Sequence, residues 1–301
     1  MKKTGTASPI RRSRADKTFD VIDYILMALA FLVVAYPLYF VVIASVSDPT
    51  AVYEGKVILL PIRPTLEGYE RIFSYSSLFT GYKNTIIYTL VGTAINVVLT
   101  ITAAYALSRR ELVGRNIVMM GVMITMIFSG GQIPNYLLVR NLGIYNTMWA
   151  LILPGAVSSY NLIVARTFFQ QNIPDELREA AELDGCTDTG FFFRVVLPLS
   201  GSIIAVMVLF YAVGHWNSYY NALIYLSSQS KYPLQLVLRN ILIVNTMDDM
   251  VNDVATQAAQ QRMGDLIKYG MIIVSSLPLM ILYPFLQRYF VQGVMIGAIK
   301  G

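Results

Sequence analysis

The densest group of chemically active side chains lies in residues 172–185, a polar stretch between two apolar ones. Only 14% of the 301 residues are charged, yet this stretch and the residues just after it carry six carboxylates: Asp175, Glu176, Glu179, Glu182, Asp184 and Asp188. The adjacent Ala180 and Ala181 would let another protein approach the backbone closely. We therefore interpret the stretch as a docking element, with a solvated loop helix as the alternative.

A helix is expected to carry these carboxylates. Pro174 suits the first turn of a helix, where its missing N–H is not needed, and the acidic residues after it face the positive end of the helix dipole. Gly185 suits the left-handed position that ends a helix. The spacing i, i+3, i+4, i+7 predicts one small, mostly apolar face made of Leu177, Ala180, Ala181 and Asp184.

Residue counts exclude or disfavour several kinds of chemistry. Cys186 is the only cysteine, which excludes an internal disulfide and a cysteine-based zinc site. His215 is the only histidine, which disfavours a histidine metal cluster and a Ser-His-Asp triad. The chain also lacks the Gly-x-x-x-x-Gly-Lys-Ser/Thr loop that binds ATP phosphates. We expect no metal site and no catalytic site in this chain.

The elements that must position the acidic stretch are apolar helices. Hydrophobic residues make up 55% of the chain, and its charged content is far below the roughly 25% of soluble domains, which predicts an all-α polytopic membrane protein. A span needs about 20 apolar residues. Six candidate transmembrane helices lie at about 24–46, 84–107, 117–128, 148–168, 199–213 and 269–289. The third is interrupted after residue 128 by Gly130, Gly131 and Pro134.

These spans divide the chain into four parts. Residues 1–20 form a basic tail that we expect to be disordered, 21–82 hold the first span and an external loop, 83–290 hold the other five spans with the acidic loop 170–198, and 291–301 form a second tail. With both termini in the cytoplasm, the inner segments hold 14 of the 23 basic residues and are the more basic side. The acidic loop is then cytoplasmic, so its docking partner must be intracellular. Because the basic residues are spread among loops, they do not indicate nucleic-acid binding.

The acidic loop carries a recognisable pattern of residues. Glu179, Ala180 and Ala181, then Gly185, then Val195-x-Leu197-Pro198 resemble the EAA loop of ABC-importer permeases. Four other stretches are similar to the MalG-like subunit of the carbohydrate-uptake branch of that family: 60–69, 104–109, 216–217 and 287–301. Together they cover nearly the whole chain from residue 22 onward.

The resemblance implies a fold, a site and a set of partners. It implies the type I ABC-importer permease fold, in the bacterial inner membrane, with a sugar or oligosaccharide as the solute. The loop would form two coupling helices, 174–184 and 187–197, with Phe191, Phe192 and Phe193 giving apolar contact to a cytoplasmic ATPase dimer. The implied coupling residues are Glu179, Ala180, Ala181, Asp184, Gly185, Leu197 and Pro198. Glu179 would pair with an arginine of the ATPase, which holds the ATP and magnesium, so no cofactor is expected in this chain.

Further contacts follow from the same resemblance. A second homologous permease subunit would complete a heterodimer, and an extracytoplasmic solute-binding protein would meet the external loop 217–268, which carries Asp248, Asp249, Asp253 and Asp265. Gly297, Lys300 and Gly301 of the C-terminal tail would contact the ATPase, with a frayed terminus as the alternative. For loop 217–268 the alternative is a solvated, charged surface.

Polar residues inside apolar spans are candidates for the solute pathway, since they are costly toward lipid. Seven are selected: Asn96, Ser158, Tyr160, Asn161, Tyr211, Trp216 and Asn217. The alternative is that they only join helices to one another. Two other functions stay open, an ABC permease for a non-sugar solute and a secondary transporter, although a secondary transporter is expected to carry charged residues inside its spans.

Overall fold

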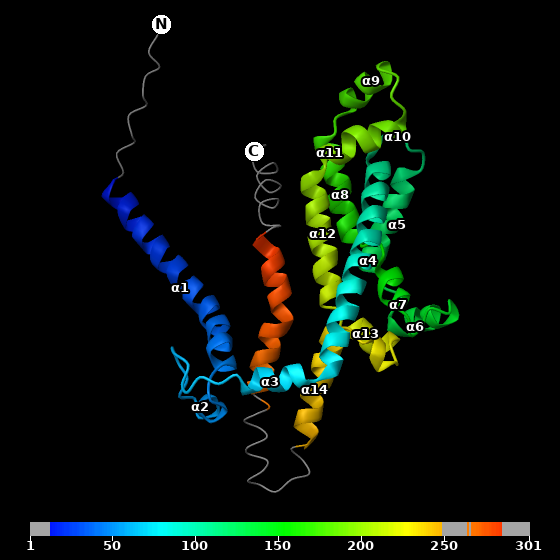
Figure 1. Ribbon diagram of the computed structural model, residues 1–301. Coiled ribbons are helices and arrows are strands. Elements are labelled where there is room, and N and C mark those ends of the chain that lie inside the picture. Colours follow the sequence, from blue (N-terminus) through cyan, green and yellow to red (C-terminus); the bar gives the residue numbers. More distant parts are fainter. Residues whose placement is uncertain (1–12, 249–263, 265, 285–301) are drawn as a thin grey trace.

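The computed structural model describes residues 13–248, 264 and 266–284, and within them every regular element is a helix (Figure 1). Several predicted contacts lie outside the described residues: those of Gly297, Lys300 and Gly301 in the tail, and those of Asp249, Asp253 and Asp265 in the external loop. Three of the described helices are long and apolar enough to cross a membrane.

Helix α1, Arg14–Ser45, begins earlier than the sequence suggested. The Ser13 hydroxyl accepts a hydrogen bond from the Asp16 N–H at 3.1 Å, and the Asp16 carboxylate accepts one from the Ser13 N–H at 2.7 Å. This capping box fixes the start of the helix. The prediction of a disordered tail over 1–20 was therefore wrong from Arg14 onward, because local capping, not apolar packing, begins the helix there.

Helix α1 stands beside the rest of the molecule and joins it only near its C-terminal end (Figure 1). The Tyr36 hydroxyl donates to the Ile58 carbonyl at 3.2 Å, and Ile43 packs with Ala51 of the short helix α2, Pro49–Tyr53. The apolar side chains along most of α1 are exposed. A bilayer or another subunit must cover them.

The next helices, α3 (Glu67–Ser74) and α4 (Ser76–Ser108), occupy part of what was predicted to be an external loop. Helix α4 begins well before Asn84, where the second span was expected. Its early polar residues are satisfied by tertiary contacts, since the Asn84 amide donates to the carbonyls of Ser230 and Tyr232 at 2.8 and 3.0 Å. Helix α4 is the central element and packs against α8, α12 and α14.

Three spans are bent pairs of helices. They are α5 (Arg115–Ile127) with α6 (Gln132–Asn141), bent by 116°; α7 and η1 (Trp149–Ile152 and Leu153–Gly155) with α8 (Ser159–Asn172), bent by 51°; and Asp188–Leu199 with α12 (Gly201–Trp216), bent by 78°. The first bend lies at the Gly130-Gly131 interruption, where Gly131 has a φ of +85°. Three straight helices, α1, α4 and Leu266–Pro284, are also long and apolar enough to span a membrane, and counting each bent pair as one span gives the six that the sequence predicts.

The first part of the external loop 217–268 is helical. Helix α13 (Tyr220–Tyr225) and η3 (Gln229–Lys231) lead to α14 (Leu234–Asp248). Leu234, Val237 and Leu238 of α14 are buried against Trp216 and against Met271 of the helix Leu266–Pro284, called here the last helix. The prediction that 217–268 is a loop was wrong over α14, because its apolar side completes a hydrophobic cluster with the spans.

Candidate functional site

The acidic loop folds into α9, Asp175–Leu183, followed by a second helical segment. The turn between them is closed by two backbone hydrogen bonds, from Gly185 N–H to the Glu182 carbonyl and from Cys186 N–H to the Ala181 carbonyl, both 2.9 Å. This is the Schellman arrangement, and it needs a left-handed residue, here Gly185 with a φ of +76°. The sequence expectation for Gly185 is confirmed. Pro174 differs slightly, because its extended ψ of 152° places it at the N-cap and not in the first turn.

The second segment is α10 (Asp188–Phe191), a π-helical turn η2 (Phe192–Val196) and α11 (Leu197–Leu199). Phe191 and Phe192 are buried, and the ring of Phe192 lies 4.9 Å from that of Tyr105 in α4. Only Phe193 is exposed, at 61%. The prediction that all three phenylalanines face a partner was wrong for Phe191 and Phe192, because their rings anchor this segment to the end of α4.

An ion-pair network joins α9 to the loop between α4 and α5. Asp175 lies 3.4 Å from Arg109 and 3.6 Å from Arg110, and Arg178 lies 2.5 Å from Glu111. Arg178 also pairs with Glu182, one turn further along α9. We call these six residues the charge clasp: Arg109, Arg110, Glu111, Asp175, Arg178 and Glu182. Exposed ion pairs contribute only about 0.2–1 kcal/mol each, so the clasp sets the position of α9 more than its stability.

Packing contacts hold Arg109, the clasp residue at the end of α4, in place. The Arg109 guanidinium lies 4.9 Å above the Tyr105 ring and donates to the Ile173 carbonyl at 3.4 Å. Tyr105 in turn packs edge-on to the buried Phe169 of α8 at 5.7 Å. The clasp was not predicted from the sequence. The available signal was the basic loop 108–115, predicted to lie on the same side of the membrane as the acidic stretch.

The opposite side of α9 carries no such partners. Glu176, Glu179, Ala180 and Leu183 are exposed and recur at i, i+3, i+4 and i+7, so they form one stripe, called here the outer stripe of α9. Leu183 is 90% exposed. Within the part of the chain that the structure describes, Glu179 makes no ion pair. The stripe has both a carboxylate and an apolar side chain to offer a partner.

The other predicted coupling residues surround this stripe. Asp184, Gly185 and Pro198 are exposed, whereas Ala181 and Leu197 are half-buried and pack against the hydrophobic cluster of α4, α8 and α12. The exposed side of α9 is therefore rotated about the helix axis relative to the predicted face of Leu177, Ala180, Ala181 and Asp184. Ala181 lies toward the protein, and Leu183 takes its place on the outside.

Deeper in the membrane core, polar side chains gather where η1 breaks before α8. The Asn96 amide of α4 lies 3.2 Å from the His215 imidazole Nε2 and donates to the Gly155 carbonyl at 3.5 Å. The Tyr211 hydroxyl lies 2.6 Å from the Thr100 hydroxyl and accepts the Ser158 N–H at 3.0 Å. These contacts satisfy backbone groups that the break exposes, so they join α4, α8 and α12 at this level.

The predicted pathway residues therefore divide. Asn96, Tyr211 and Trp216 are buried and engaged in contacts between helices; the Trp216 indole donates to the Ser275 carbonyl at 3.0 Å. Asn161 is also buried, and Asn217 bonds back to the Val213 carbonyl of its own helix. Tyr160 is 55% exposed. This placement favours the helix-joining alternative for the buried residues, and contact of any of them with a solute stays a prediction.

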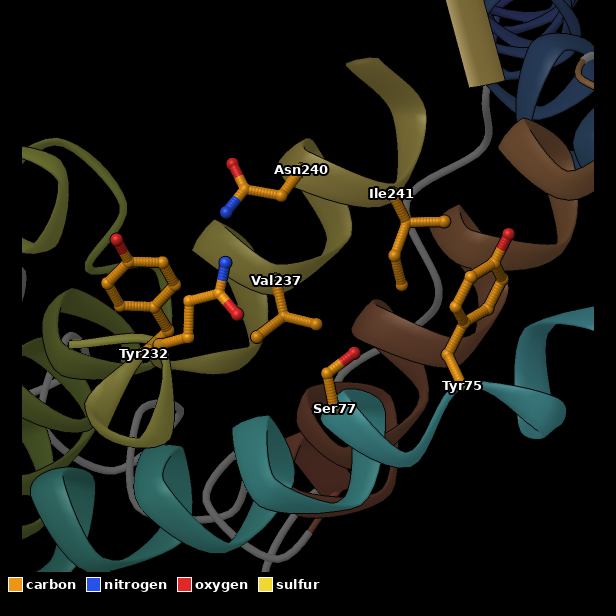
Figure 2. Close-up of a pocket in the computed structure, with 7 residues that line it drawn as sticks. Tyr75, Ser77, Tyr232, Val237, Asn240 and Ile241 are labelled. Atoms are coloured by element: carbon orange, nitrogen blue, oxygen red, sulfur yellow. The ribbon is translucent and has the colours of Figure 1, made fainter. Parts of the chain in front are cut away.

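A hollow lies at the other end of α4, away from α9, and its mostly apolar lining includes Val237 and Ile241. It has a volume of about 180 Å³ between the start of α4, η3 and α14 (Figure 2). Its walls combine two aromatic rings with amide and hydroxyl groups, those of Tyr75, Ser77, Gln229, Tyr232 and Asn240. None of these polar side chains is charged. Such a lining is suited to a neutral, hydroxyl-rich ligand.

The bent apolar helices, with an acidic two-helix loop at one end, are the arrangement that the resemblance to ABC-importer permeases implies. Comparison with known proteins agrees. The chain belongs to the family of binding-protein-dependent transport system inner membrane components, whose model matches residues 6–296.

Three proteins illustrate the similarity. The chain is 38% identical to Protein LplC of Bacillus subtilis over 292 residues, which is 97% of this chain and 98% of that protein. It is 40% identical over 287 residues to the polygalacturonan/rhamnogalacturonan transport system permease protein YtcP of the same organism, covering 95% and 99% of the two chains. Its fold matches a bacterial ABC transporter involved in the import of the acidic polysaccharide alginate, with a TM-score of 0.83, 29% identity and coverage of 94% and 100%.

These findings confirm the predicted fold class and the resemblance to ABC-importer permeases. The chain is a non-catalytic permease subunit of the inner membrane, and the ATPase and the solute-binding protein are separate partners.

Proposed function

We propose that this chain forms half of a membrane pathway for a sugar or oligosaccharide and that α9 couples the pathway to the ATPase. The observation that carries the coupling role is the division of α9 into two sides. One side is held by the charge clasp to the α4–α5 loop, and the other, the outer stripe, is exposed. A helix fixed to its own chain on one side and open on the other is suited to transmit a partner's movement.

Glu179 supplies the specific contact in this proposal. It lies at the middle of the outer stripe, between Glu176 and Leu183, where an arginine of the ATPase could pair with it while Leu183 enters an apolar cleft. A partly buried pair of this kind fixes the register of docking more than it adds affinity. ATP and magnesium stay on the ATPase, and this chain holds no cofactor.

The proposal includes an orientation and an assembly. The end of the molecule with α9 faces the cytoplasm, which places the hollow of Figure 2 on the outer side, where a binding protein delivers the solute. A second, homologous permease subunit completes the pathway. The exposed apolar surfaces of α1 and of α4, where Leu90 and Val98 are exposed, are available for lipid and for that subunit.

The solute class rests on two supports. YtcP is named for polygalacturonan and rhamnogalacturonan, and the similar solved structure is described as an importer of alginate. The outer hollow offers the aromatic rings and hydrogen-bonding groups that saccharides need. We infer a saccharide solute from both together.

Charge reversal at Glu179 tests the coupling role. In the complete complex in membrane vesicles, Glu179→Arg is expected to abolish ATP-dependent uptake while the amount of the chain in the membrane is unchanged. Glu70→Arg, a reversal at an exposed position of α3, is the matched control and should retain uptake. Uptake by Glu179→Arg at the level of this control would remove the basis for the proposal.

A further inference from the structure

A second hollow lies on the other side of α14 from the one in Figure 2. Its volume is about 410 Å³, within the range of ligand pockets in proteins. Its walls come from three places along the chain: Tyr219, just before α13; α14; and the first half of the last helix. Val237 and Asn240 of α14 face the first hollow, whereas Gln235 and Arg239 line the second.

The second hollow differs from the first in its charge. Arg239 lies within the apolar segment Leu234–Ile243, and Lys268 lies near the start of the last helix, which is itself apolar enough to span a membrane. Neither cation has an ion pair with another of the described residues. Both side chains line the hollow, so their charges are available to an anionic ligand that enters it.

The other groups in this hollow are those that bind a sugar ring. The Arg239 guanidinium is 5.9 Å from the centre of the Tyr219 ring, which holds the cation at the wall and leaves its N–H groups free to donate. Gln235 adds an amide, and Ser275 adds a hydroxyl whose hydrogen is used by the Ile272 carbonyl at 3.1 Å. The hollow thus combines two cations with an aromatic ring, an amide and a hydroxyl acceptor.

We infer that this hollow is a subsite for an acidic saccharide, a sugar whose carboxylate is bound by Arg239 and Lys268. Arginine binds carboxylates through paired N–H donors, and a nearby lysine adds a point charge. The inference rests on the proposed saccharide transport and makes it more specific. The neutral hollow of Figure 2 and this cationic one, on the two sides of α14, would then receive the hydroxyl groups and the carboxylate of passing sugars.

The test compares a charged with an uncharged saccharide of the same size. The complete complex is reconstituted in vesicles with its binding protein, and uptake is measured for trigalacturonic acid and for its methyl ester. Arg239→Gln and Lys268→Gln are expected to raise the KM for the acid roughly tenfold and to change that for the ester less than about twofold. Lys83→Gln removes an exposed cation of α4 outside this hollow and is the matched control.

The possible outcomes separate the proposals. Equal effects of Arg239→Gln on acid and ester would overturn the subsite, because the cation would then serve only to hold the protein together. An effect that appears only in vesicles with phosphatidylglycerol, for both saccharides, would assign the hollow to a lipid headgroup and also overturn it. Failure of the unaltered complex to transport either saccharide would exclude oligogalacturonides as its solute and overturn the subsite, whereas the broader proposal of a saccharide solute would stand.

Discussion

In the proposed orientation the end of the permease with α9 is the cytoplasmic end and the opposite end is the outer end, and the two ends use charge in opposite ways. At the cytoplasmic end, Arg178 pairs with Glu111 and Glu182 of its own chain, so that α9 is tied to the α4–α5 loop. At the outer end, Arg239 and Lys268 have no such pair among the described residues and line a hollow. The difference indicates that the cytoplasmic end is organised to move as one body, whereas the outer end keeps polar groups for a ligand.

Helix α4 joins the two ends. Its 33 residues span about 50 Å. Ser77, near its start, lines the hollow of Figure 2, and Arg109, at its C-cap, is part of the charge clasp. Because the helix is continuous, a displacement of α9 would reach the outer hollow through it. The predictions below disturb first the cytoplasmic end, then the middle of α4, then its outer end.

The largest effect is expected for Gly185→Pro. Proline fixes φ near −65°, whereas Gly185 needs +76°, and proline also removes the N–H that donates to Glu182. The two coupling segments would then meet at a different angle, and uptake should be lost. Uptake in membrane vesicles, with the amount of protein determined in the same membranes, measures this.

Two further variants make the Gly185 result interpretable. Gly185→Ala adds only the cost of a left-handed alanine, about 1–2 kcal/mol, and should keep part of the uptake. Gly214→Ala, in open space in α12, should keep all of it. Full activity of Gly185→Pro would show that the turn has no part in coupling.

Arg178→Glu is expected to lower the ratio of solute transported to ATP hydrolysed roughly tenfold, a smaller effect than that of Gly185→Pro. The change puts a third carboxylate between Glu111 and Glu182 and turns two attractions into repulsions. Adding Glu111→Arg restores one pair of opposite charges and should recover part of the coupling. The measurement is the ratio of solute transported to ATP hydrolysed, which loss of folded protein alone would not change; an unchanged ratio in Arg178→Glu contradicts the role of the clasp.

The sequence predicted the acidic loop far better than the polar contacts around it. The role of Gly185 as the end of α9 could be predicted, because the left-handed conformation that ends a helix favours glycine. The clasp could not, because the pairing of Arg109 with Asp175 depends on how two loops distant in sequence meet. Helix α14 was not predicted for a related reason. Its apolar side is buried by spans that are distant in sequence, and the sequence does not show that they meet it.

The middle of α4 is tested by Gly92→Ala. A methyl group at Gly92 would lie 2.5 Å from Nε2 of His215, so the imidazole would have to leave its contact with Asn96. We expect a loss of stability of about 1–3 kcal/mol, seen as a lower midpoint of thermal unfolding in detergent. Gly121→Ala, in open space in α5, is the control and should not lower the midpoint. Equal midpoints for both variants would show that the contact between Gly92 and His215 accommodates a methyl group.

The smallest effect is expected at the outer end, for Asn240→Ala. Asn240 lines the hollow of Figure 2, where the alanine would remove an amide that can hydrogen-bond to a solute. We expect a rise of a few-fold in the KM for uptake and no change in ATP hydrolysis without solute. Asn141→Ala, at the exposed end of α6, is the control. A change in solute-free hydrolysis would show that the two ends are not separate in function.

The central claim is that the outer stripe of α9 is covered by the ATPase, and thiol labelling tests it most directly. In a Cys186→Ser background, Leu183→Cys places a thiol at a 90% exposed position of the stripe, and Val113→Cys places one at a 95% exposed position of the α4–α5 loop. Each is treated with a membrane-permeant maleimide, with and without co-expressed ATPase. We predict that the ATPase protects Leu183→Cys and leaves Val113→Cys reactive. Equal labelling of Leu183→Cys with and without the ATPase would contradict the account.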